Sequence, residues 1–143
     1  MSARSCAARR GASSVEMLRD VVGRKFAERA VTVVKPDDLL LTAHNRMRLY
    51  EFSQLPVIEN ERVVGIIDES DVLLAVHKDP GRFRQPVRDF MSRQLKTLDP
   101  STPVEDVVGI LDSGMAGMLY VDNQFYGLIT KADLLNYIRR KLL

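Results

Sequence analysis

The sequence predicts an α/β fold in which two β-α-β-β-α repeats are related by a pseudo-two-fold axis. Residues 57–73 align without gaps with residues 119–135, and the matched aspartates Asp71 and Asp133 are 62 positions apart. In both copies, runs of β-branched residues alternate with apolar residues spaced three and four apart, which are the periods of strands and helices. Two copies of one unit in a chain of 143 residues predict a paired array.

The composition is that of a globular domain of ordinary size. A chain of 143 residues with 45% hydrophobic content buries roughly two-thirds of its unfolded surface. Its net charge of +2 gives no reason to expect a membrane or a nucleic acid as partner. Cys6 is the single cysteine, so an intrachain disulfide is excluded and a reducing compartment is favoured. No apolar run reaches the length of a bilayer span, and we expect a soluble, cytoplasmic protein.

The chain before the first repeat has two parts. Residues 1–14 are rich in Ala, Ser and Arg, contain no acidic residue and show no apolar period, which predicts a disordered tail. Residues 15–30 are predicted to form a leading helix and a connector. Apolar residues such as Leu18 and Val22 recur there at helical spacing.

The first repeat is predicted at residues 31–80. Its opening strand ends at a proline turn, and the following helix is expected to bury Leu39, Ala43, Met47 and Tyr50 on one face. Turn-type residues then separate two short strands, and a second helix completes the unit. The expected elements are a strand at 31–34, a helix at 39–50, strands at 55–58 and 62–67, and a helix at 70–77.

Residues 81–94 are predicted to link the repeats, with one helical turn near 87–91. The arginines of this linker could contact phosphate groups. No aromatic stacking platform accompanies them, however, which favours a solvated connector over a nucleic-acid surface. The second repeat is predicted at residues 95–143, where apolar residues from Val104 to Leu111 follow the i, i+3, i+4, i+7 pattern of an amphipathic helix. Its other expected elements are strands at 95–98, 118–121 and 124–129, and a terminal helix that runs to residue 143.

Thr130 and Asp133 stand where the last strand passes into the terminal helix. The spacing Thr-x-x-Asp before an apolar run is the signature of a capping box, which stabilises a helix by roughly 1 kcal/mol with or without a ligand. The same hydroxyl and carboxylate also suit a polar ligand, since the unpaired backbone N–H groups of a helix N-terminus attract anions. Both roles stay open at this point.

Several blocks, in order, resemble the paired CBS domain, also called the Bateman module. They include the stretch Gly-Leu-Ile-Thr-Lys-Ala-Asp-Leu-Leu that begins at Gly127 and the stretch Phe-Ser-Gln-Leu-Pro-Val that begins at Phe52. The resemblance covers residues 30–143. More narrowly, these two stretches are similar to the C-terminal regulatory region of cystathionine β-synthase.

The resemblance implies a regulatory module that binds an adenosyl compound, namely S-adenosylmethionine, AMP, ADP or ATP, in clefts between the two copies. In that family's pattern Asp133 would hold the ribose hydroxyls and Thr130 a phosphate or the polar tail of the ligand. The adenine and sugar would be lined by Leu128, Phe52, Ser53, Gln54 and Leu55. The resemblance also implies a homodimer and a catalytic partner, such as a cystathionine β-synthase-like domain, and no cofactor beyond the regulatory ligand.

The first copy departs from this pattern at Asp68, where the family has Thr or Ser. A carboxylate about 4 Å from a phosphate costs roughly 4 kcal/mol per charge pair at a surface-like dielectric constant. We therefore expect one working site that contains Thr130 and Asp133. The site that contains Asp68 and Asp71 is expected to be empty or to take a ligand without phosphate.

Other chemistry finds little support in the sequence. His44 and His77 have no Cys or acidic partner at ligand spacing, so we expect no metal site. No phosphate-binding Gly-rich loop, nucleophile elbow or zinc-protease signature occurs, and Lys131 is expected to be solvated or phosphate-facing rather than a Schiff-base lysine. We expect no catalytic residue. The main rival hypothesis is a ligand-free dimerisation module in which Thr130 and Asp133 only cap a helix.

Overall fold

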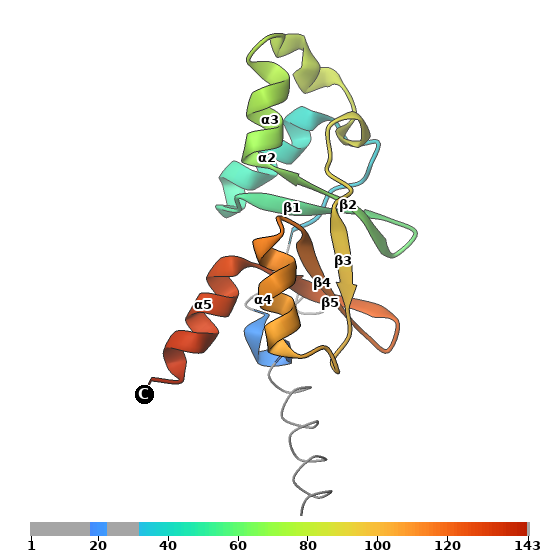
Figure 1. Ribbon diagram of the computed structural model, residues 1–143. Coiled ribbons are helices and arrows are strands. Elements are labelled where there is room, and N and C mark those ends of the chain that lie inside the picture. The colour runs from blue at the N-terminus through green and yellow to red at the C-terminus, as the bar shows by residue number, and fades with distance from the viewer. Residues whose placement is uncertain (1–17, 23–31, 143) are drawn as a thin grey trace, which may run out of the picture. The chain divides into compact units, whose positions relative to one another are not determined.

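The computed structural model describes residues 18–22 and 32–142 (Figure 1). The chain divides into two compact units. Of the described residues, unit 2 contains 32–95 and holds the first repeat, whereas unit 1 contains 18–22 together with 96–142 and holds the second repeat. The predicted tail at residues 1–14 lies outside the described residues.

Unit 2 is a β-hairpin that carries two helices, which contact each other and the strands (Figure 1). Its elements are α2 (Leu40–Tyr50), β1 (Gln54–Glu59), β2 (Arg62–Asp68) and α3 (Glu69–Val76). Asn60 and Glu61 join the antiparallel strands with φ angles of 52° and 65°. Positive φ at both positions is the mark of a type I′ turn, whose twist matches that of a hairpin. The predicted order of elements is confirmed from α2 to α3.

The core of unit 2 shows one error in the sequence prediction. Leu39 and Tyr50 were expected on the buried face of α2, but their side chains are 42% and 54% exposed. Leu39 is the N-cap and has an extended backbone, so its side chain does not follow the helical period, and Leu40 is buried instead. The buried cluster consists of Val34, Leu40, Ala43, Met47, Leu55, Val57, Ile67, Val72, Ala75 and Val87.

In residues 32–34, the described part of the strand predicted at residues 31–34, the sheet pairing is a single parallel β-bridge between Val34 and Val57. The amide of Val34 donates to the carbonyl of Pro56 at 3.1 Å. The chain then turns away from the sheet, because the amide of Lys35 donates to the Asp38 carboxylate at 2.8 Å. The proline turn predicted after this segment is confirmed.

The segment between the repeats is bonded to unit 2. It contains two 3₁₀ helices, η2 (Pro80–Arg84) and η3 (Val87–Asp89), the second of which falls where a helical turn was predicted. The side chain of Val87 is fully buried, and its amide donates to the carbonyl of Asp38 at 2.8 Å. Gly65 allows the close approach of this segment, since a Cβ atom there would lie 2.5 Å from the sulfur of Met91.

Unit 1 repeats the hairpin-and-helix plan around a three-stranded sheet of order β3-β4-β5. Its elements are β3 (Leu95–Leu98), α4 (Val104–Asp112), β4 (Ala116–Val121), β5 (Gln124–Ile129) and α5 (Lys131–Arg140). The turn at Asp122 and Asn123 again has positive φ at both positions, 52° and 63°. Register shifts follow Val57 in one hairpin and Leu119 in the other, which are equivalent positions of the repeat.

The leading helix contributes to unit 1 rather than to the repeat that it precedes in the chain. Residues 18–21 are helical, and Leu18, Val21 and Val22 are nearly or fully buried. They share a core with both helices and the sheet of the second repeat. That core consists of Leu18, Val21, Val22, Leu98, Val107, Leu111, Leu119, Ile129, Leu134 and Tyr137.

Candidate functional site

The junction between β5 and α5 is a complete capping box. Thr130 is the N-cap, and its Oγ1 accepts a hydrogen bond from the amide of Asp133 at 3.1 Å. In return, Oδ2 of Asp133 accepts from the amide of Thr130 at 3.1 Å. Two backbone donors that the helix leaves unpaired are thus satisfied, and the predicted capping role is confirmed.

Asp133 retains capacity for a ligand. Its side chain is half-buried, and the bond from Thr130 is the one side-chain hydrogen bond that it accepts within the described part of the chain. A carboxylate offers about four acceptor positions on two oxygens. Capping therefore leaves room for the two hydroxyl groups of a diol. Capping and ligand binding are compatible at this carboxylate.

The junction between β2 and α3 has the same geometry but a second carboxylate. The Asp71 amide donates to Asp68 Oδ1 at 2.8 Å, and the Asp68 amide donates to Asp71 Oδ2 at 3.1 Å. Burial raises the pKa of Asp71 above its ordinary value of 3.8, and the neighbouring Asp68 charge raises it further, against a lowering effect of the backbone hydrogen bond. This junction disfavours additional negative charge.

The predicted lining residues differ in accessibility. Leu128 lies on β5 with 9% of its surface exposed, whereas Leu55 lies on β1 and is fully buried in the core of unit 2. Phe52 and Gln54 are half-buried, and Ser53 is exposed. The structure brings Thr130 and Asp133 together two residues beyond Leu128, and it groups Phe52 to Leu55 separately within unit 2.

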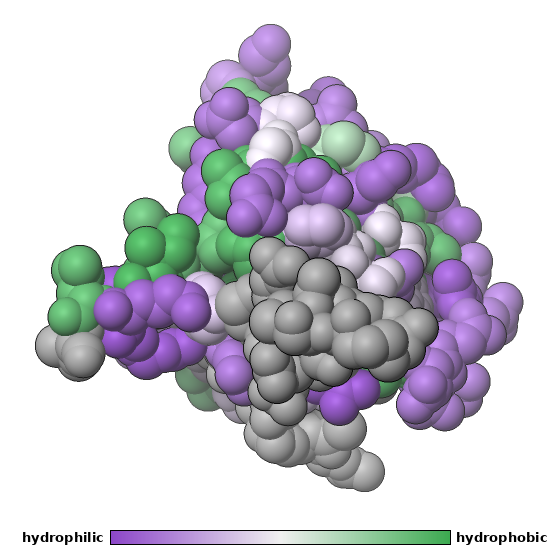
Figure 2. Space-filling model, turned by 60° about the horizontal axis from the view of Figure 1, so that its bottom comes forward, coloured by the Kyte–Doolittle hydropathy of each residue, from purple (hydrophilic) through white to green (hydrophobic). Residues whose placement is uncertain are grey.

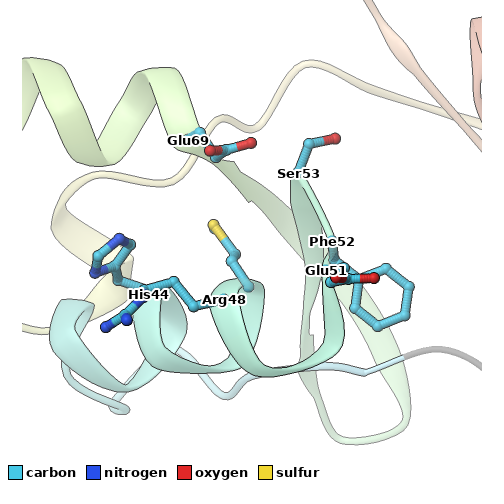
Figure 3. A pocket seen from close by; sticks show the side chains of 7 residues that line it. His44, Arg48, Glu51, Phe52, Ser53 and Glu69 are labelled. Carbon is cyan, nitrogen blue, oxygen red and sulfur yellow. The ribbon is translucent and has the colours of Figure 1, made fainter.

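Phe52 and Ser53 line a pocket of about 320 Å³ that lies entirely within unit 2 (Figure 3). Its floor includes Met47, whose side chain is 3% exposed. The remaining lining residues are His44, Arg48, Glu51 and Glu69. A concave site with an apolar floor and a few charged groups around it is a typical small-molecule site.

The four charged or titratable residues of this pocket were not predicted as site residues. His44 and Arg48 are four positions apart on α2, Glu51 follows the end of that helix, and Glu69 begins α3. The i, i+4 spacing of His44 and Arg48 was the one signal in the sequence, since it places both on one helix face. A solvated helix face shows the same spacing, so the pattern alone does not identify a pocket.

Other kinds of site are not observed in the residues that the structure covers. Within residues 18–22 and 32–142, no group of three or more His, Cys, Asp or Glu side chains could hold a metal ion. The same residues include no helix with the length and apolarity that crossing a membrane requires. Lys131, at the first position of α5, is exposed.

The fold and the paired capping boxes define a two-repeat α/β module. The family model of the CBS domain matches residues 13–78 and 87–140. The chain therefore belongs to the CBS domain family, and it carries two CBS repeats.

Relatives of known sequence are longer proteins. The chain is 30% identical over 140 residues to inosine-5'-monophosphate dehydrogenase of Methanocaldococcus jannaschii, a match that covers 92% of this chain and 27% of that protein. Two uncharacterized proteins of the same organism match at 26% identity. The chain spans 27% to 34% of the length of these curated relatives.

Solved structures share the fold. CBSX2, a CBS-pair protein of Arabidopsis thaliana, has been crystallised in complex with AMP; that structure matches with a TM-score of 0.72 at 19% identity, over 87% of this chain and 97% of that one. An uncharacterized conserved protein from Pyrococcus horikoshii matches with a TM-score of 0.64 at 28% identity, over 77% and 86% of the two chains.

Proposed function

We propose that this chain is a regulatory CBS-pair module that binds an adenosyl ligand, S-adenosylmethionine or AMP, ADP or ATP, and modulates a partner enzyme. The observation that carries the proposal is the Asp133 carboxylate, which caps α5 with one oxygen and keeps acceptor capacity for a ribose. The AMP complex of CBSX2, a protein of the same fold, supports the choice of an adenosyl ligand.

The proposed roles follow from the chemistry of each group. Asp133 accepts hydrogen bonds from the ribose hydroxyls, and Thr130 contacts a phosphate or the ligand's polar tail beside the N-terminus of α5. Leu128 with Phe52, Ser53 and Gln54 lines the flat base and the sugar. Leu55 contributes through its backbone, since its side chain is fully buried in unit 2.

One of the two junctions is proposed as the stronger site. In the first repeat the position equivalent to Thr130 is Asp68, which presents a carboxylate where Thr130 presents a hydroxyl. This carboxylate lies beside Asp71, whose pKa is raised by burial and by the Asp68 charge. A phosphate brought to this junction would meet two acidic groups. The site that contains Asp68 and Asp71 therefore stays empty, or takes a ligand without phosphate.

The proposed assembly is a homodimer that pairs through its helices. Val108, Leu135 and Ile138 line an apolar groove of about 270 Å³ between α4 and α5, and the side chains of Leu135 and Ile138 are 67% and 47% exposed. Green hydrophobic side chains gather along α5 at the left of Figure 2. On α3, Leu73 and Leu74 are 64% and 67% exposed. A second copy would remove this apolar surface from water.

A catalytic partner is proposed because the chain corresponds to about a third or less of its matched relatives, one of which is a dehydrogenase. A cystathionine β-synthase-like catalytic domain is one proposed partner, on the resemblance of the stretches that begin at Phe52 and Gly127, and the single cysteine favours the cytoplasm. The ligand would act by differential affinity, stabilising one of two states of the assembly that the enzyme also distinguishes.

Isothermal titration with AMP, ADP, ATP and S-adenosylmethionine tests the binding site. Asp133→Asn keeps an acceptor oxygen for the capping bond but removes the charge, and should weaken binding about 10- to 100-fold, the effect of a hydrogen bond to a charged group. Asp71→Asn makes the same chemical change in the other capping box and is the matched control. Equal losses in both variants would contradict the assignment to Asp133.

A ligand-free dimerisation module is the alternative, favoured by the apolar groove and by capping boxes that are complete without a ligand. Thermal unfolding separates the two functions, because a ligand at a hundred times its dissociation constant adds about 2.7 kcal/mol of stability. A higher unfolding temperature with one of the four compounds supports the regulatory module. No shift with any of them supports the structural one.

A further inference from the structure

The pocket of unit 2 separates charges of opposite sign. Figure 3 shows the side chains of His44 and Arg48 toward one end of α2, with Glu51 at the other end and Glu69 and Ser53 across from the helix. The basic and acidic groups thus face one cavity from different directions. A ligand that carries both charges fits such a pocket better than one that carries either sign alone.

These charges are not neutralised by the surrounding protein. The ion pairs seen in residues 18–22 and 32–142 join Arg46 to Asp38 and Arg88 to Asp37, and they involve no lining residue of the pocket. Within the same residues the side chains of Arg48, Glu51 and Glu69 make no hydrogen bond to protein. Their donors and acceptors are open to a ligand.

Glu51 has a backbone conformation that favours glycine. Glu51 follows α2 with φ of 58° and ψ of 42°, the left-handed conformation, and the next amide, of Phe52, donates to the carbonyl of Met47 at 3.0 Å. Glycine is the favoured residue at this position of a helix end. In the other repeat the left-handed residue after α4 is indeed Gly114. A glutamate at the first site brings a carboxylate to the pocket at a cost to the backbone.

We infer that this pocket binds an α-amino acid group, so that the module prefers adenosyl compounds that carry one, such as S-adenosylmethionine or S-adenosylhomocysteine, over nucleoside polyphosphates. Arg48 binds the ligand's carboxylate, and Glu51 with Glu69 binds its ammonium group. Of the two roles proposed for Thr130, this inference therefore keeps the contact with a phosphate and assigns the amino acid tail to the pocket. The inference rests on the proposed function, because Phe52 and Ser53 belong both to this pocket and to the proposed adenosyl site.

A polyphosphate matches the same groups poorly. ATP would bring several negative charges to a pocket that offers one guanidinium and two carboxylates. An amino acid group instead places one charge of each sign opposite a group of the other sign. The volume of about 320 Å³ is sufficient for such a group together with part of the sugar.

The test compares S-adenosylhomocysteine with 5′-methylthioadenosine, which has the same thioether but no amino acid group. With the intact chain, calorimetry should show that S-adenosylhomocysteine binds about 10- to 100-fold more tightly. Two variants of the pocket should remove this advantage, namely Arg48→Met and the double variant Glu51→Gln with Glu69→Gln. In both, the affinity for methylthioadenosine should change less than about twofold. Arg93→Met, and Glu59→Gln with Glu61→Gln, make the same charge changes at exposed positions of unit 2 outside the pocket and should keep the advantage.

The outcomes separate this inference from the proposed function. Binding of AMP and methylthioadenosine with no advantage for S-adenosylhomocysteine overturns the inference alone, and so does tighter binding of ATP than of S-adenosylhomocysteine. No binding by any adenosyl compound overturns both. The comparison of ligands on the intact chain is decisive even if a pocket variant fails to fold.

Discussion

The two strand-to-helix junctions have the same backbone hydrogen bonds and differ in the chemistry of the N-cap side chain. Both are complete capping boxes, with backbone-to-side-chain distances between 2.8 and 3.1 Å. One presents a hydroxyl and a carboxylate at Thr130 and Asp133, and the other two carboxylates at Asp68 and Asp71. The fold therefore requires a capping side chain at this position of each repeat, and it accepts either chemistry. The choice between them bears on what each junction can bind.

The helix ends that precede the hairpins differ in a similar way. The left-handed residue after α2 is Glu51, and the one after α4 is Gly114. Glycine satisfies the backbone at no steric cost, while glutamate adds a charged side chain that lines a pocket. In both comparisons one repeat uses the chemically neutral solution and the other adds a carboxylate. The repeats have thus diverged at positions where folding tolerates a choice.

The largest effect is expected from Thr130→Asp, which gives the working junction the chemistry of the other one. Aspartate is a good N-cap, so α5 should remain folded. A carboxylate about 4 Å from a phosphate costs roughly 4 kcal/mol, which is close to a 1,000-fold loss of affinity for AMP. Adenosine lacks the phosphate and is the control ligand. Calorimetry that finds equal losses for AMP and adenosine would refute the electrostatic explanation.

The reciprocal change, Asp68→Thr, should create a second phosphate site. Threonine keeps a hydroxyl acceptor for the Asp71 amide and removes the charge that a phosphate would meet. The AMP stoichiometry per chain should rise from one to two in a calorimetric titration. Two AMP molecules per unsubstituted chain, or a stoichiometry that the substitution leaves at one, would break the comparison between the junctions.

Local features of both junctions could be predicted from the sequence, because their bonds join residues three apart. The Thr130–Asp133 spacing alone implied a cap, and the structure shows it. The strand predicted at residues 31–34 was too long, since among the described residues 32–34 the bridge to β1 is made by Val34, and β-branched composition does not show how many residues find a partner strand. The sequence also did not predict that Leu18 packs in the core of unit 1, because an apolar helix face is compatible with the core of either repeat.

The pocket in unit 2 was beyond such reasoning for a different reason. Its polar and titratable residues run from His44 on α2 to Glu69 on α3, and no single period of the sequence connects them. Only the packing of the two helices on one hairpin brings them around one space. Glu51 is the partial exception. Once the end of α2 is known, the sequence shows a charged residue at a position where glycine is favoured.

Capping strength is the next comparison. Thr130→Ala and Asp68→Ala should each lower the free energy of unfolding by about 1 kcal/mol, because each leaves the amide at the third helix position without its acceptor. For a chain of this size the unfolding temperature should fall by about 3 °C. Thermal unfolding without ligand is the measurement. A loss at only one junction would show that the two caps are not equivalent, contrary to their geometry.

The helix ends give a smaller pair of effects with opposite signs. Glu51→Gly should raise the free energy of unfolding by about 0.5–1 kcal/mol, because glycine adopts the left-handed backbone conformation without steric strain. The same variant should bind S-adenosylhomocysteine more weakly. Gly114→Glu should lower the free energy of unfolding by a similar amount, since φ there is 89° and no atom lies within 4 Å to obstruct a side chain. Chemical denaturation measures both. Changes of the same sign would contradict a common backbone cause.

The smallest effect concerns the pKa of Asp71, which burial, and then the Asp68 charge, raise above 3.8. The folded state holds this proton more tightly than the unfolded chain. The resulting stability is present below the unfolded pKa of about 3.9 and is lost as the pH rises through the folded pKa. Asp68→Asn keeps a capping acceptor, removes the like charge and should lower the pKa of Asp71.

An NMR titration of the Asp71 carboxyl carbon measures this pKa directly. Asp79→Asn is the control, since it removes a carboxylate beyond the far end of α3 and should leave the Asp71 midpoint in place. A midpoint at or below 3.8 in the unsubstituted chain would show that the capping hydrogen bonds outweigh burial. The acidic junction would then carry its two charges without penalty, and repulsion of phosphate would have to come from Asp68 alone.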